Sequence, residues 1–191
     1  QTATVSGGGL TWTLARRVTA QFGTSEVWSA IAPTAVANAT VTATMAFPTS
    51  QTSLTVVTYA GASGIGASAG ASAVSGAPTV SVTTTRAGSL VYGVGNDWDG
   101  TIARTLAAGQ TLVHQYLGPN DTHWVQTLSA GTVSAAGTTV QLQGTAPTNH
   151  RWNFVAVEIL GVQPVGPPSA SAGSGQSVTA GGAVTLTGTA S

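Results

Sequence analysis

Residues 152–160 read Trp-Asn-Phe-Val-Ala-Val-Glu-Ile-Leu and form the most apolar stretch of this 191-residue chain. Side chains of a strand alternate between its two faces. Here both faces are apolar, which predicts a central strand of a sheet that is covered on both sides. Glu158 then lies on the face of Trp152 and Phe154, where a buried carboxylate needs a partner such as an arginine.

Alternation of apolar and polar residues predicts further strands. A clear example is Leu10-Thr-Trp-Thr-Leu14, and turn-rich Gly, Pro, Asn and Ser stretches separate it from the next ones. No segment predicts a helix. The expected fold is all-β: an antiparallel β-sandwich of jelly-roll type with about ten strands. The expected strands cover residues 10–14, 26–31, 41–45, 54–59, 80–84, 89–94, 111–117, 123–128, 138–143 and 152–160.

Two segments depart from this pattern. Gly61 to Pro78 reads GASGIGASAGASAVSGAP, a low-complexity run of small residues that we expect to form a surface loop. Residues 161–168, GVQPVGPP, contain three prolines and predict an extended linker between a sandwich domain of residues 1–160 and a tail of residues 169–191.

The tail contains two short alternating segments joined by Gly181-Gly182, which predicts a β-hairpin. An isolated hairpin is at best marginally stable in water, so we expect this strand extension to pair with a further surface. Its apolar side chains Val178, Val184 and Leu186 are the candidate assembly residues.

Composition excludes several classes of function. Charged residues make up 5% of the chain, five basic and five acidic, against roughly 25% in an average domain. The basic residues are scattered arginines, so we expect no nucleic-acid partner. No apolar run approaches the roughly 20 residues needed to cross a bilayer, so we expect no membrane insertion.

Asn96, Asp97 and Asp99 are the candidate metal ligands, because carboxylate and amide oxygens on a loop suit calcium. The alternative is a turn held by hydrogen bonds from the same side chains to the backbone, with no ion. We expect no other cofactor. Trp98, in the same loop, is the candidate glycan contact, whereas the other tryptophans alternate with apolar neighbours and are expected in the core.

Histidines offer a second metal hypothesis. If Leu117 pairs with Thr122, His114 and His123 lie on one face of the sheet, and with His150 they resemble a zinc ligand set. The alternative is that they are ordinary strand residues.

No catalytic set emerges, and we expect no enzyme. Gly66-Ala-Ser-Ala-Gly70 matches a nucleophile-elbow pattern, but it lies in a repetitive stretch without the strand-to-helix turn that the elbow requires. Glu26 and Glu158 are the only glutamates, and nothing in the sequence places them together as an acid/base pair.

Two resemblances add to this reading. GGGLTWTL (7–14), GVGNDWD (93–99) and WNFVAVEI (152–159) are similar to a module of large secreted bacterial surface proteins. Residues 170–191 resemble the first two strands of a polycystic-kidney-disease-type immunoglobulin-like repeat. The resemblance of the body implies a β-sandwich in an extracellular or cell-surface setting, and it supplies no catalytic residues to carry over to this chain.

Two functions remain. The first is a secreted structural module that assembles with copies of itself into a filament or layer, by addition of the tail or of the segment from Thr2 to Ser6 to a neighbour's sheet. Low charge and the absence of lysine favour such edge-to-edge contacts. The alternative is an adhesive module that binds polysaccharide, with exposed aromatic residues around Trp98.

Overall fold

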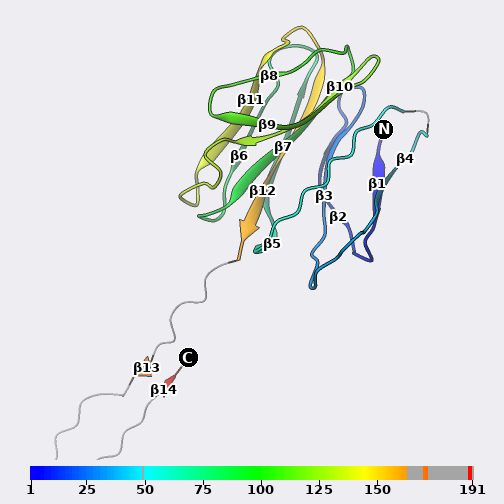
Figure 1. The fold of residues 1–191 in the computed structure, drawn as a ribbon. Helices are drawn as coiled ribbons and strands as arrows, with labels where there is room; N and C mark the ends of the chain where they lie inside the picture. Colours follow the sequence, from blue (N-terminus) through cyan, green and yellow to red (C-terminus); the bar gives the residue numbers. More distant parts are fainter. Residues whose placement is uncertain (49, 163–169, 172–188, 191) are drawn as a thin grey trace, which may run out of the picture.

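The computed structural model describes residues 1–48, 50–162, 170–171 and 189–190 and is drawn in Figure 1. These residues contain no helix, and so none that is long and apolar enough to cross a membrane. The predicted all-β, antiparallel, sandwich-like fold is confirmed. The strands are β1 (Ala3–Gly7), β2 (Thr13–Val18), β3 (Ser25–Ser29), β4 (Val41–Met45), β5 (Ala62–Ala73), β6 (Thr79–Thr83), β7 (Leu90–Asp97), β8 (Thr105–Leu106), β9 (Gln110–Leu117), β10 (Thr122–Leu128), β11 (Thr139–Ala146), β12 (Trp152–Gly161), β13 (Ala170–Ser171) and β14 (Thr189–Ala190).

Two sheets form the central sandwich. One has five strands in the order β5-β12-β7-β10-β9, and the other has three in the order β6-β11-β8. Their facing sides enclose the hydrophobic core, where the rings of Trp124 and Phe154 pack with centroids 5.4 Å apart and Leu142 is fully buried. Burial of such large side chains supplies most of the driving force for folding.

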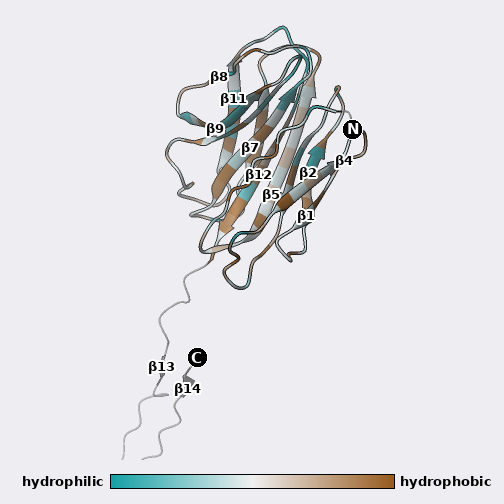
Figure 2. Ribbon diagram, turned by 45° about the vertical axis from the view of Figure 1, so that its right-hand side comes forward, coloured by the Kyte–Doolittle hydropathy of each residue, from teal (hydrophilic) through white to brown (hydrophobic). Residues whose placement is uncertain are grey.

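β12 is an interior strand, as its sequence predicts, with β5 on one side and β7 on the other. Trp152, Phe154 and Ala156 face the sandwich core, and Val155 and Val157 are equally buried on the opposite face. Figure 2 shows hydrophobic residues gathered along β7 and β12. This strand is apolar on both faces because a further layer covers its second face.

That further layer comes from the first 60 residues, which lie beside the second face of the five-stranded sheet (Figure 1). It contains two small antiparallel sheets, β1–β4 and β2–β3. Asn153 of β12 anchors it: its side-chain oxygen accepts a bond of 2.9 Å from Gln21 N, and its carbonyl accepts one of 2.9 Å from Ser25 Oγ. The segment from Thr2 to Ser6 pairs with β4 of its own chain.

The prediction of a surface loop from Gly61 to Pro78 is wrong. Residues 62–73 form β5, a 12-residue edge strand paired with β12. Small residues are required because other side chains press close to this strand: a Cβ added at Gly66 would overlap the Glu158 carboxylate, and one at Gly70 would overlap Val18. Close packing therefore outweighs the low strand propensity of glycine and alanine.

The prediction of a strand at residues 54–59 is also wrong. This segment belongs to no ladder, although Thr55 Oγ1 lies 3.1 Å from His114 Nδ1. Alternating side chains suit any extended segment that covers a surface, whereas a strand also needs a hydrogen-bonding neighbour. The strand expected at residues 10–14 begins later, at Thr13.

Beyond residue 162 the structure describes β13 and β14, which pair in antiparallel fashion through Ala170 with Ala190 and Ser171 with Thr189. The predicted linker of residues 161–168 begins too early, because Gly161 is the last residue of β12 and Val162 N donates to Gly61 O at 2.7 Å. The rest of that linker, the predicted hairpin turn and the candidate assembly residues Val178, Val184 and Leu186 lie outside the described residues.

Gly95 of β7 is needed for the core, because a Cβ at this position would overlap the Trp124 ring. We expect Gly95→Ala to lower the free energy of unfolding by about 2–3 kcal/mol through overpacking. Gly144→Ala in β11 is the matched control, since its Cβ would meet its nearest neighbour at an ordinary 3.5 Å. Urea denaturation of both variants measures the effect, and equal stability of the two would contradict the expectation.

Candidate functional site

β9 is a free edge of the five-stranded sheet. Its sequence, Gln-Thr-Leu-Val-His-Gln-Tyr-Leu, contains no lysine, arginine, carboxylate or proline. Six of its eight residues are exposed, among them the large hydrophobic side chains of Leu112, Val113, Tyr116 and Leu117. Natural edge strands usually carry charges or prolines that prevent pairing with other chains. β9 lacks both.

The opposite edge, β5, is better covered. Its residues are half-buried apart from Ser63, and Val18 of β2 packs closely against Gly70. β9 is therefore the edge of this sheet that is open to another strand. The sequence contains a signal for this feature, namely a run without charge or proline, but it does not reveal that the run lies at an edge.

The register that the histidine hypothesis assumed is present between β9 and β10. Leu117 lies opposite Thr122, Tyr116 opposite His123, and His114 opposite Val125, so His114 and His123 share one face. Each imidazole contacts a polar neighbour: His114 Nδ1 lies 3.1 Å from Thr55 Oγ1, and His123 Nε2 lies 3.1 Å from Asp121 Oδ2. A bulge between Val125 and Gln126 leaves Val113 as the extra residue.

The third histidine is elsewhere. His150 Nδ1 lies 2.8 Å from the carboxylate of Asp97, on the other side of the sheet from His114 and His123. Across the part of the chain that the structure describes, no group of three or more His, Asp or Glu residues is arranged to hold a metal ion.

The structure does not bring Asn96, Asp97 and Asp99 together around one point. Asn96 and Asp97 are consecutive in β7, so their side chains leave opposite faces. Asn96 is buried beside Asn153, whose amide nitrogen lies 3.2 Å from it. Asp99 forms an ion pair of 2.7 Å with Arg151 Nε, and this contact lowers the pKa of its carboxyl although burial alone would raise it. Calcium at these residues stays a prediction.

Asp97 belongs to a buried charge cluster that the sequence did not reveal. Its carboxylate is fully buried and pairs with Arg104 Nη2 and with His150, while Asp99 N donates to it at 2.7 Å. The Arg104 guanidinium lies 4.5 Å from the centre of the Trp124 ring, a cation–π geometry. Burial lowers the pKa of Arg104, and the adjacent carboxylate partly offsets this. The cluster ties β7 to the segments before β8 and β12.

Glu158 is buried as expected, but its expected arginine partner is wrong. Its carboxylate accepts backbone bonds from Ala67 N (2.9 Å), Thr85 N (2.8 Å) and Arg86 N (3.1 Å), and one from Thr85 Oγ1 (2.8 Å). Burial alone would raise the pKa of Glu158, but these hydrogen bonds outweigh burial and lower it to about 2. Glu158 therefore has a structural role, joining β5 and the turn after β6 to β12.

Trp98 is half-buried, and none of the aromatic pairs among the described residues includes it. The structure therefore shows no stacking platform around it in that part of the chain. A glycan contact at Trp98 stays a prediction, which a Trp98→Ala variant on a glycan array tests.

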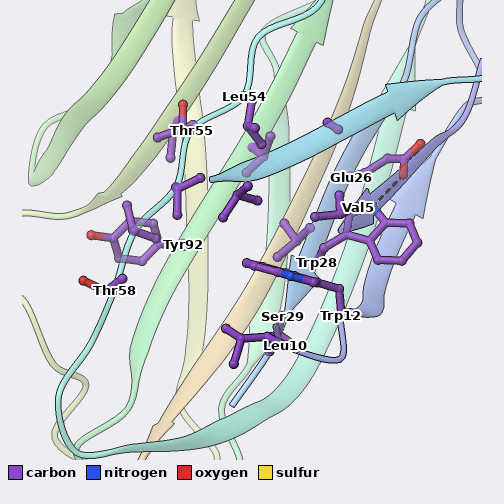
Figure 3. Close-up of a pocket in the computed structure, with 18 of the residues that line it drawn as sticks. Val5, Leu10, Trp12, Glu26, Trp28, Ser29, Leu54, Thr55, Thr58 and Tyr92 are labelled. Carbon is purple, nitrogen blue, oxygen red and sulfur yellow. Dashed lines mark hydrogen bonds between the residues drawn. The ribbon is translucent and has the colours of Figure 1, made fainter. Parts of the chain in front are cut away.

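A large cavity separates the N-terminal layer from the five-stranded sheet. Its volume is about 1210 Å³. Figure 3 shows Leu10, Trp12 and Trp28 projecting into it from the N-terminal layer, with Tyr92 of β7 across from them. Leu54 and Thr55 belong to the covering segment, residues 51–60, which also lines the cavity. Alternating apolar residues between Val5 and Tyr59 signal a covered surface, but nothing in the sequence indicates that a cavity remains beneath them.

The described residues form an all-β, antiparallel, sandwich-like module in which β9 is an exposed, uncharged sheet edge and a partly open, mainly apolar cavity lies beneath the N-terminal layer. Comparison of the chain with protein-family models, with curated proteins and with solved structures found no match.

Proposed function

We propose that this chain is a structural module of an extracellular filament or layer and assembles with copies of itself by strand addition at β9. The single observation that carries the proposal is the open edge of β9, which is exposed, largely hydrophobic and free of charge and proline. Unpaired N–H and C=O groups of an edge bind an added strand, and pockets for alternate side chains provide specificity.

The bulge at Val113 limits the regular part of this edge. Residues 114–117 continue in uninterrupted register with β10 and offer a straight acceptor for an incoming strand. Leu117 ends this stretch, Leu112 lies on the other side of the bulge, and both are exposed, so they are apolar contacts available to the partner.

The proposed donor is the tail of a neighbouring copy. Residues 161–191 contain no charged side chain, and Val178, Val184 and Leu186 provide apolar residues at strand spacing. Contact between a tail and an edge joins two different surfaces, so it propagates into a filament unless it closes into a ring.

Charges placed on either partner test the proposal. We expect the mass of the unmodified chain to rise with concentration by light scattering and negative-stain microscopy, and we expect Leu112→Lys/Leu117→Lys, and separately Leu186→Lys, to abolish this rise. Val36→Lys/Val74→Lys is the matched control, since Val36 is as exposed as Leu117 (44% each) but lies in the loop between β3 and β4. It should assemble normally.

Two outcomes would overturn strand addition at β9: an unmodified chain that stays monomeric at all concentrations, or a β9 variant that assembles as well as the control. A third outcome, assembly that is unaffected by Leu186→Lys, would overturn the tail as the donor. The last outcome would leave β9 as an edge that accepts some other segment and would remove the tail from the account.

A further inference from the structure

The cavity beneath the N-terminal layer is larger than a packing defect. At about 1210 Å³ it exceeds the roughly 300–1,000 Å³ of sites that enclose drug-sized ligands. Its walls are mainly aliphatic and aromatic, with Trp12 and Trp28 on one side and Val94, Val125 and Val157 of the sheet on the other.

The carboxylate that lines the cavity already has hydrogen-bonding and ionic partners. Glu26 is the sole carboxylate among its lining residues, and no lysine or arginine lines it. The Glu26 carboxylate accepts bonds of 2.9 Å from Arg17 Nη2, Trp28 Nε1, Thr24 Oγ1 and Ala3 N. His114 and His123 also line the space, and their rings contact Thr55 Oγ1 and Asp121 Oδ2. A charged ligand would therefore enter a mainly apolar space without a lysine or arginine to pair with it, at a high desolvation cost.

Exposed hydrophobic side chains gather on the same lining. Ile31 and Val36 of the loop between β3 and β4, and Leu54, Val56 and Val57 of the covering segment, line the cavity and are also open to solvent. Contiguous apolar surface of this kind marks a binding site more often than a free surface. Here it forms an apolar path between solvent and the cavity.

From volume, lining and charge we infer that this cavity binds a neutral, apolar small molecule of lipid size. The walls belong to one chain, and the space between two of its layers is only partly open to solvent, which suits a small molecule rather than a second protein. The indole rings of Trp12 and Trp28 offer flat apolar surfaces to such a guest.

A pair of related dyes tests the inference. N-phenyl-1-naphthylamine is neutral, and 8-anilinonaphthalene-1-sulfonate has closely similar rings with an added sulfonate. We expect the neutral dye to bind saturably at one site per chain, by fluorescence titration, and the anionic dye to bind at least about tenfold more weakly because no lysine or arginine lines the cavity to pair with the sulfonate.

Substitutions in β4 test whether the neutral dye binds in the cavity. Ala43 lines the cavity, and the adjacent Thr44 points outward to solvent. Ala43→Trp should fill the space and weaken binding of the neutral dye by at least about tenfold, whereas Thr44→Trp should bind as the unmodified chain does. Circular dichroism verifies folding. If Ala43→Trp does not fold, Val5→Trp on the paired strand replaces it, with Thr4→Trp as its control.

Absence of saturable binding of the neutral dye would overturn the inference. Equal binding of the two dyes would do so as well, and so would unchanged binding in a folded variant that fills the cavity.

Discussion

Replacement of Asp97 by asparagine is expected to lower the free energy of unfolding by about 3–5 kcal/mol, because it leaves the buried Arg104 guanidinium without its counter-charge. The Arg104 side chain is fully buried, and Asp97 is the carboxylate paired with it. Loss of the charge also removes the partner of His150 Nδ1, which lies 2.8 Å from Asp97 Oδ2.

A double-mutant cycle isolates this pair. Arg104→Met replaces the guanidinium with an apolar side chain of similar length, and the combined Asp97→Asn/Arg104→Met variant removes both charges. We expect the double variant to lose less stability than the sum of the two single variants, by at least about 1 kcal/mol, since neither charge is then left unpaired. Urea denaturation at neutral pH provides the three values. Additive losses would show that the two side chains do not stabilise each other.

Replacement of Glu158 by glutamine is expected to cost about 3 kcal/mol at neutral pH. Three backbone N–H groups and one hydroxyl donate to this carboxylate. Glutamine offers one acceptor oxygen and turns an NH₂ group toward these donors, so buried donors lose their partners. Asp99→Asn is the control, because its ion pair with Arg151 is partly exposed and contributes little.

The contribution of Glu158 should depend on pH. Its pKa is about 2 in the folded chain against an ordinary value of 4.5. As the pH falls from about 4.5 towards 2, the unfolded chain takes up the proton before the folded chain does, so the stability supplied by the carboxylate is lost across this range. Above it, the contribution is constant. The stability difference between the unmodified chain and Glu158→Gln should therefore shrink as the pH falls, and a constant difference from pH 7 down to about 3 would contradict this assignment.

Part of this architecture was predictable, because local pattern and burial agree there. Trp152 to Leu160 is apolar on both faces and is an interior strand, and the strands predicted at residues 111–117 and 123–128 are present as β9 and β10. In both cases the hydrophobic pattern and the turn chemistry specify the same arrangement.

The remainder depends on contacts between segments distant in the sequence. β5 is a strand because it pairs with β12, and its residues are small because Glu158 and Val18 leave no room for larger side chains beside them. Its own sequence contains no strand signal. Glu158 finds backbone donors at residues 67, 85 and 86, which no local pattern brings together. The partnership of Asp97 with Arg104 and His150 and the cavity beneath the N-terminal layer are likewise properties of the assembled layers.

Hydrogen–deuterium exchange of the β9 amides over a range of protein concentration tests the central claim most directly. Strand addition at β9 pairs its outward-facing N–H groups with a neighbouring chain. We therefore expect exchange in residues 110–117 to slow as concentration rises, while exchange in β5 at the opposite edge stays constant. Exchange in β9 that is fast and independent of concentration, under conditions where the chain is associated by light scattering, would contradict assembly through this edge.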